Sequence, residues 1–127
     1  MAENSELRKR ILIVDDDESV RDLISRVLQY QSRYEIISAR DGIEALEILR
    51  KGEKCGNIYG IVTDINMPCL DGIGLAKEID KNGRKYPILF VSGHGADSEI
   101  VYSGPRGFLS KPFSIEALLN NAKKLFG

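Results

Sequence analysis

The stretch Ile11-Leu12-Ile13-Val14-Asp15-Asp16-Asp17 decides how the rest of the chain is interpreted. Its first four residues are apolar and mostly β-branched, which is typical of a strand buried on both faces of a sheet. Three carboxylates follow without a spacer, so the end of this strand concentrates negative charge. Apolar residues at helical spacing come next and predict a helix directly after the aspartates: Val20, Leu23, Ile24, Val27 and Leu28.

The same order of strand and helix recurs along the chain. Further apolar runs predict strands at residues 34–39, 58–63, 88–91 and 108–109. Helical stripes are predicted to face inward from Ile43, Leu46 and Leu49, from Ile73, Ala76 and Ile79, and from Ile115, Leu118, Ala122 and Leu125. Asp41-Gly42 and Asp71-Gly72 are interpreted as turns, and Asp17 and Ser114 as helix caps. This alternation predicts an α/β fold with a parallel sheet and helices on both faces.

Length and composition restrict the chain to a small set of protein classes. Its 127 residues are enough for one domain, and we expect a polar lead-in at 1–9 and one domain at 10–127. Lys and Arg number 18 and Asp and Glu 19, so no broad basic field is available for binding nucleic acid directly. No apolar run approaches the ~20 residues that span a bilayer, and the polar start does not resemble a signal peptide. We therefore expect a cytoplasmic protein without membrane contact.

The two cysteines, Cys55 and Cys69, are too few for a disulfide framework or a zinc site. We interpret both as reduced thiols. Cys69 lies in the loop after the third strand, where it is either redox-sensitive or inert, and inertness is the commoner outcome.

Five polar residues fall where strands of the predicted sheet end. They are Asp15, Asp16, Asp64, Ser92 and Lys111. In open parallel sheets the functional crevice lies at these carboxyl ends. Clustered carboxylates repel one another unless a cation lies among them, and oxygen ligands without histidine or thiolate suit Mg²⁺. With a lysine and a hydroxyl nearby, such a site suits a phosphoryl group that a carboxylate attacks.

Each of these residues also has an ordinary structural interpretation. An aspartate or serine after a strand usually caps the next helix, and a lysine before proline usually lies on the surface. Five such residues at the carboxyl ends of strands are harder to explain by capping and solvent exposure alone.

Four segments in order make the chain resemble the receiver domain of two-component response regulators. They are residues 11–17, residues 64–72 (Asp-Ile-Asn-Met-Pro-Cys-Leu-Asp-Gly), residues 90–93 (Phe-Val-Ser-Gly) and residues 111–113 (Lys-Pro-Phe). The resemblance covers about residues 9–127. It implies a flavodoxin-like doubly wound (βα)5 three-layer sandwich with strand order 2-1-3-4-5.

The resemblance also implies a role for each site residue. Asp64 is then the phosphoacceptor. Mg²⁺, or Mn²⁺, is held by Asp15, Asp16, Asp64 and the backbone carbonyl of Asn66. Lys111 contacts the phosphoryl group and precedes a cis peptide bond to Pro112, while Ser92 and Phe108 are the switch hydroxyl and the switch aromatic. In the family, phosphorylation reshapes the distal face of the sheet, a two-state response to one charged ligand.

Two further residues are candidates for tuning the site, and Gly93 is a candidate for leaving it accessible. By the family resemblance, Asn66 and His94 influence how long the acyl phosphate lasts, and we expect His94 to border the site entrance. A solvent-exposed histidine without a role is an equally good interpretation. Gly93 either leaves room for the phosphodonor or merely begins a flexible loop.

The chain departs from the family between the fourth and fifth strands. Only 19 positions separate Ser92 from Lys111, and this segment contains four glycines and Pro105. Residues 97–102 alone have any helical character. We therefore expect the fourth helix to be shortened, mobile or partly unwound, which puts the family's usual mode of dimerisation in doubt.

The leading hypothesis is a phosphoacceptor in bacterial two-component signalling, not an enzyme with a small-molecule substrate. Its expected partners are a histidine kinase or phosphotransfer protein and a downstream protein on the face formed by the fourth helix, fifth strand and last helix. The alternative is a phosphorylation-independent interaction module on the same fold. A flavin or dinucleotide binder would need a glycine- or hydroxyl-rich loop after the first strand, where this chain has three aspartates. A phosphatase of the haloacid dehalogenase type would have its nucleophile among those aspartates, but no cap domain is evident.

Overall fold

The computed structural model describes residues 8–30, 33–52, 57–93 and 100–127. Strands and helices alternate through these parts of the chain except before the last strand, where no described helix intervenes. In order they are β1 (Lys9–Val14), α1 (Glu18–Tyr30), β2 (Tyr34–Ala39), α2 (Gly42–Arg50), β3 (Gly60–Asp64), α4 (Gly72–Lys81), β4 (Ile88–Ser92), β5 (Arg106–Ser110) and α5 (Ile115–Phe126).

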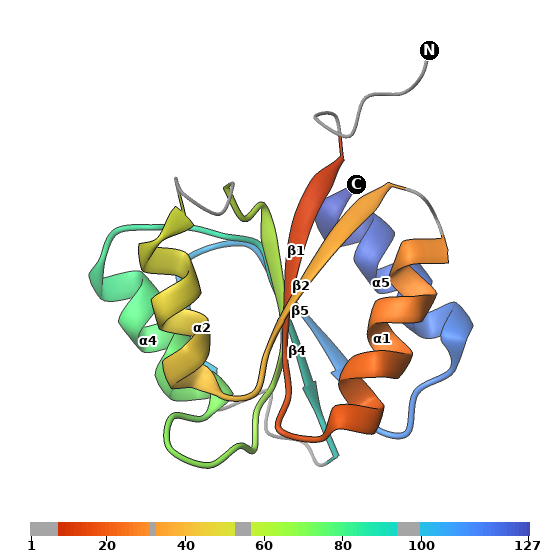
Figure 1. Ribbon diagram of the computed structural model, residues 1–127, viewed down its shortest axis with the longest axis horizontal. Coiled ribbons are helices and arrows are strands. Elements are labelled where there is room, and N and C mark those ends of the chain that lie inside the picture. The colour runs from red at the N-terminus through yellow and green to blue at the C-terminus, as the bar shows by residue number, and fades with distance from the viewer. Residues whose placement is uncertain (1–7, 31–32, 53–56, 94–99) are drawn as a thin grey trace.

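The strands form one parallel sheet in the order β2-β1-β3-β4-β5. Helices α1 and α5 cover one face of this sheet, and α2 and α4 cover the other (Figure 1). The predicted flavodoxin-like, doubly wound three-layer fold with strand order 2-1-3-4-5 is therefore confirmed. All carboxyl ends of the strands meet along one edge, the lower edge in Figure 1.

Apolar residues fill both spaces between sheet and helices. The wholly apolar runs in β1 and β4 are buried because these strands have neighbours on both sides and helices on both faces. Side chains of Leu12 and Phe90 belong to the core under α2 and α4, while Ile13 and Val91 belong to the core under α1 and α5. Asp15 thus directly follows a strand whose apolar residues are buried on both faces of the sheet.

Caps define where the helices begin. The Asp41 side chain accepts a hydrogen bond from the Glu44 amide, and Asp71 accepts one from the Gly74 amide. Both residues are N-caps, so the interpretation of these Asp-Gly pairs as turns alone was incomplete. Asp17 and Ser114 cap α1 and α5 as predicted, with Asp17 Oδ1 accepting from the Ser19 amide at 2.9 Å.

Three residues that were predicted to face inward are substantially exposed. Leu23 is 45% exposed, Ile43 49% and Ile115 57%. Ile43 and Ile115 lie in the first turns of α2 and α5, before the stripes of buried residues begin. Leu23 lies beside the stripe formed by Ile24 and Leu28, which contacts the sheet. Periodicity located each helix correctly but predicted a wider buried face than the sheet can cover.

The connection from β4 to β5 differs most from a regular βα repeat. Residues 100–105 contain no helix, in agreement with the shortened helix predicted there, and residues 94–99 lie outside the described residues. Tyr102 is buried, and its hydroxyl donates to the Tyr86 carbonyl at 2.7 Å. Ser103 binds the Asp80 carboxylate through both its amide and its hydroxyl. Residues 102–103 are thereby held against α4 and against Tyr86, which precedes β4.

Within the described parts of the chain, no helix has the length and apolar character needed to cross a membrane.

Candidate functional site

Three carboxylates converge at the carboxyl edge of the sheet. Strands β1 and β3 are neighbours in parallel register, with Val14 opposite Thr63, so Asp15 and Asp64 follow side by side. One carboxylate oxygen from each of Asp15, Asp16 and Asp64 lies within 4.8 Å of the other two. The convergence predicted from sequence is therefore present.

The three carboxylates differ in burial and in hydrogen bonding. Asp15 is only 1% exposed and Asp64 7%, whereas Asp16 is exposed. Asp15 Oδ1 accepts a hydrogen bond from the Asp17 amide at 2.9 Å, and Asp64 Oδ1 accepts one from the Asn66 amide at 3.4 Å. The remaining oxygen of each buried carboxylate, Oδ2, faces the lysine described next.

Lys111 lies between the two buried carboxylates. Its Nζ is 3.6 Å from Asp15 Oδ2 and 3.5 Å from Asp64 Oδ2. The Lys111 amide donates to the Ser92 carbonyl at 2.8 Å, which ties the residue after β5 to the end of β4. The peptide bond between Lys111 and Pro112 is cis, as the family resemblance predicted.

Burial raises the pKa of both buried carboxyl groups. For Asp15, burial outweighs the Asp17 amide and Lys111, which lower the pKa, and the charges of Asp64 and Asp16 raise it further. For Asp64, burial likewise outweighs Lys111 and the Asn66 amide. One lysine does not compensate for burying these carboxylates, so the cluster favours additional positive charge.

The donor set fits a hard divalent cation. Only carboxylate oxygens converge here, with no histidine or thiolate among the described residues of the cluster. The exposed position of Asp16 leaves one side of the cluster open to solvent, which suits Mg²⁺ because this ion retains several waters. The proposed ligand role of the Asn66 carbonyl stays a prediction.

Ser92 lies on β4, next to the strand that carries Asp64, and Phe108 lies on β5, one strand further away. Ser92 is buried at the end of β4 and opposite Ser110 of β5. Phe108 is half-buried on β5 and opposite Phe90 of β4, where it packs against the core under α2 and α4. Their places match the prediction, while their roles as switch residues stay predictions.

Two contacts that shape the site were missed by the sequence interpretation. A Cβ on Gly72 would collide with the Asp64 carbonyl oxygen and lie 2.9 Å from Ile65 Cα. Gly72 also donates its amide to the Ile65 carbonyl at 2.9 Å, which folds the loop after Asp64 back onto the strand. Arg21 Nη1 donates to the Asp15 carbonyl at 2.7 Å. Of these contacts, only those of Gly72 had a counterpart in the sequence, namely the glycine itself. From the sequence alone, we interpret that glycine as part of a turn.

Gly93 and Cys69 are the remaining candidates that the structure describes. A Cβ on Gly93 would meet no atom of the described residues within 4 Å, which is compatible with either interpretation of this glycine. Cys69 is exposed and has a positive φ of 70°, an uncommon conformation for a residue other than glycine. The predictions for His94 and Cys55 concern positions outside the described residues.

Comparisons with known proteins agree with this geometry. Residues 11–123 match the model of the response regulator receiver domain. The response regulator MprA of Mycobacterium sp. (strain KMS) is 34% identical over 119 residues, which cover 91% of this chain and 50% of MprA. MprA of Mycobacterium ulcerans is 35% identical with similar coverage. The chain thus spans about half the length of these curated relatives.

Solved structures agree as well. The receiver domain of the Francisella response regulator 1452 is 30% identical, with a TM-score of 0.81 over 94% of this chain and 97% of that one. The response regulator TrrA of Thermotoga maritima, solved in complex with Mg²⁺ and BeF, is 33% identical with a TM-score of 0.76 over 92% and 98%. The fold, the acidic cluster and the match over residues 11–123 together show that the chain belongs to the response regulator receiver domain family.

Proposed function

We propose that Asp64 accepts a phosphoryl group from a phosphohistidine of a histidine kinase or phosphotransfer protein. The observation that carries this proposal is the position of Lys111 Nζ between the Oδ2 atoms of Asp15 and Asp64. A lysine held there can contact the oxygens of a phosphoryl group attached to Asp64 Oδ2, in a cluster that favours added positive charge.

The proposed step is a direct transfer to a carboxylate. Asp64 Oδ2 attacks phosphorus and forms a P–O bond, while the P–N bond to the donor imidazole breaks. The electron pair of that bond returns to the imidazole nitrogen, which is then free to take a proton. Asp64 Oδ1 stays hydrogen-bonded to the Asn66 amide, so the carboxylate is already oriented for the attack.

Asp15, Asp16 and Asp64 are the residues that would hold Mg²⁺ in this proposal, with the Asn66 carbonyl as a further ligand. A bound Mg²⁺ supplies positive charge that stabilises the equatorial oxygens of the transferring phosphoryl group. Asp15 is kept in place by the Asp17 amide and by the contact of Arg21 with its own carbonyl. The buried end of the site is thus organised before any ligand arrives.

Ser92 and Phe108 are proposed to convey the modification to the rest of the domain. Ser92 ends the strand beside β3, so its hydroxyl is near enough in the fold to respond to a phosphoryl group on Asp64. Phe108 is paired with Phe90 one strand further from the site, and its half-buried side chain has room to change its burial. A downstream protein would bind the face that includes β5 and α5.

The proposal describes a signalling domain that catalyses only its own phosphorylation and dephosphorylation. The phosphorylation-independent module gains no support, because the acidic pair, the acceptor position and the lysine are all together. Contact with a kinase and a downstream protein, absence of direct nucleic-acid contact and a cytoplasmic location are parts of the proposal. They rest on the family and on the sequence features described above.

Intact mass spectrometry after incubation with acetyl phosphate and Mg²⁺ tests the acceptor. We expect one phosphoryl adduct that depends on Mg²⁺ and is removed by hydroxylamine, which cleaves acyl phosphates. Asp64→Asn should abolish the adduct. Asp71→Asn is a matched control, because this N-cap lies in the same loop and asparagine also caps helices.

Two results would overturn the proposal. One is an adduct that persists in Asp64→Asn, and the other is no adduct from either acetyl phosphate or a phosphorylated histidine kinase under conditions where Mg²⁺ binding has been measured.

A further inference from the structure

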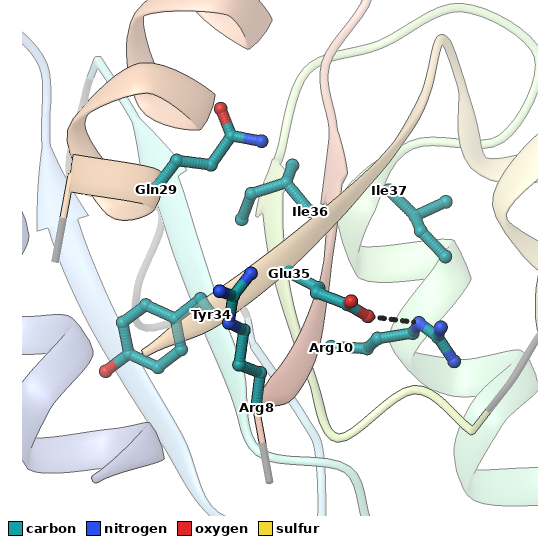
Figure 2. A pocket seen from close by; sticks show the side chains of 7 residues that line it. All are labelled: Arg8, Arg10, Gln29, Tyr34, Glu35, Ile36 and Ile37. Atoms are coloured by element: carbon teal, nitrogen blue, oxygen red, sulfur yellow. Dashed lines mark ion pairs between the residues drawn. The ribbon is translucent and has the colours of Figure 1, made fainter. Parts of the chain in front are cut away.

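A groove of about 610 Å³ lies along the free edge of the sheet. Its lining comes from residues 34–37 of β2, from Arg8 and Arg10 at the start of β1 and from Gln29 of α1, and it includes neither the site aspartates nor Lys111 (Figure 2). Strand β2 is the outermost strand and pairs only with β1 among the described residues. The groove therefore borders a strand that has an unoccupied side.

The hydrogen-bonding pattern shows which backbone groups face that side. The Lys9 amide donates to the Arg33 carbonyl, and the Asp15 amide donates to the Ala39 carbonyl, each at 3.2 Å. Peptide groups alternate along a strand, so the odd-numbered residues of β2 bond to β1. The amides and carbonyls of Tyr34, Ile36 and Ser38 then point away from β1, toward the free side of β2. Tyr34, which is buried, and Ile36 line the groove, and Ser38 is exposed directly after the last lining residue of the strand, Ile37.

The strand carries little of the usual protection of a sheet edge, because its one charged side chain, Glu35, is paired with Arg10 of the same sheet. Its sequence, Tyr-Glu-Ile-Ile-Ser-Ala, contains no lysine or proline, and its register with β1 is unbroken over all six residues. Exposed edges without such features readily accept another strand. Ile36 and Ile37 are half-buried on opposite sides of β2, so an added strand would cover apolar surface on both faces (Figure 2).

The charge of the groove selects among possible occupants. Arg10 Nε pairs with the carboxylate of Glu35 at 2.9 Å, which neutralises the only acidic side chain in the lining. Arg8 is exposed and makes no ion pair with another described residue. The lining keeps a net positive charge, which attracts carboxylates and disfavours pairing with the equally positive groove of a second copy.

We propose that this groove binds an extended, acidic segment of a partner protein, which adds to the sheet as a strand beside β2. Its backbone would bond to the outward groups of Tyr34, Ile36 and Ser38, and its carboxylates would contact Arg8 and the free guanidinium nitrogens of Arg10. This site is separate from the acidic cluster, so the proposal does not depend on phosphorylation of Asp64.

The test is amide hydrogen exchange of the full chain with a blocked decapeptide of alternating valine and glutamate. We expect exchange at Tyr34, Ile36 and Ser38 to slow by about tenfold or more when the peptide is saturating. Exchange at Glu35, Ile37 and Ala39 is the internal control, because these amides already bond to β1. A peptide with lysine in place of glutamate should give no protection.

Variants of the chain separate the contribution of backbone hydrogen bonds to peptide binding from the contribution of charge. Ser38→Pro removes an outward donor without breaking a bond to β1, so the fold should persist while protection by the peptide is lost. Ser38→Ala keeps the amide and should bind normally. Arg8→Glu should weaken binding, whereas Lys77→Glu on α4 makes the same change in net charge away from the groove and should not.

Three outcomes would overturn the proposal. In the first, the peptide slows exchange equally at the outward amides of Tyr34, Ile36 and Ser38 and at the amides that bond to β1. In the second, the lysine peptide binds as well as the glutamate peptide. In the third, the outward amides become protected as the protein concentration rises, without any peptide. The last would show that a second copy of the chain occupies the edge.

Discussion

Lys111 and Asp15 come from opposite ends of the chain, yet Lys111 Nζ lies 3.6 Å from Asp15 Oδ2 and an almost equal 3.5 Å from Asp64 Oδ2. The lysine therefore serves two carboxylates at once and fully neutralises neither. Because the Lys111 amide is bonded to the Ser92 carbonyl, its side chain is directed across the carboxyl ends of β1, β3 and β4.

Replacing this lysine should raise the pKa of both buried carboxyl groups. In Lys111→Met, burial and mutual repulsion remain while the largest charge that lowers the pKa of Asp64 is lost. Carboxyl ¹³C chemical shifts followed as a function of pH in the absence of Mg²⁺ would report the two coupled titrations. Lys85→Met, an exposed lysine remote from the cluster, should leave both titrations unchanged, and an unchanged Lys111→Met profile would refute the inferred role of the lysine.

The acidic cluster should make the protein less stable as the pH rises. The pKa of Asp15 and of Asp64 is raised in the folded state, so the folded protein releases these protons later than the unfolded chain does. Stability from this source is fully present below the unfolded pKa near 3.8 and is lost as the pH rises through the folded values. Urea unfolding at intervals from pH 3.5 to neutrality, on the order of one pH unit apart, would measure this slope.

Neutralising one buried carboxylate should therefore stabilise the metal-free protein. Asp15→Asn keeps an oxygen that accepts from the Asp17 amide and removes a buried charge, with an expected gain of about 1–2 kcal/mol at neutral pH. Mg²⁺ should raise the unfolding free energy of the original protein, because it binds only the folded cluster, and should do little for the variant. If Mg²⁺ raised the unfolding free energy of both proteins equally, Asp15 would not be one of the metal ligands.

Particular residues show how much of this molecule the sequence could predict. The apolar runs before Asp15 and Asp64 identified two strands, the first of them as buried on both faces, and parallel topology then required the two aspartates to meet. Lys111 was placed correctly for the same reason. These predictions depend only on where strands end, a property that local patterns record well.

Other features depend on contacts between distant segments and were not predictable in this way. The exposure of Ile43 and Ile115 depends on how far the sheet extends beneath each helix. The bond from Arg21 to the Asp15 carbonyl and the close approach of Gly72 to Asp64 require the folded loop. The sparsely protected edge of β2 became visible only when strand order and register were known.

Tyr102 offers a test of how firmly the connection before β5 is anchored. Its ring lies edge-on to Phe90 with centroids 6.5 Å apart, and its hydroxyl bonds to the Tyr86 carbonyl. Tyr102→Phe keeps the packing and leaves that carbonyl without its partner, so we expect a loss of about 1 kcal/mol in unfolding free energy.

The pH dependence of that loss follows from the tyrosine itself. Burial raises the pKa of Tyr102 to about 12 from its usual 10.0. The stabilisation by its neutral hydroxyl is present below pH 10 and declines as the pH rises toward 12. Between pH 10 and pH 12, the unfolding free energy measured by chemical denaturation should therefore fall less in Tyr102→Phe than in the original protein. Parallel losses in the two proteins would show that Tyr102 ionises as freely in the folded state as in the unfolded chain.

Gly72 and Gly93 provide a matched pair of substitutions, one at the start of α4 and one directly after β4. In Gly72→Ala the added methyl group would overlap the backbone of Asp64 and Ile65, and neither backbone segment can move without shifting the acceptor. We expect a loss of about 1–3 kcal/mol in unfolding free energy and slower phosphorylation by acetyl phosphate. Gly93→Ala adds the same methyl group to open space, so its stability should stay within about 0.5 kcal/mol of the original. If Gly72→Ala retained full stability and an unchanged phosphorylation rate, the close packing of this loop against Asp64 would not be what positions the acceptor.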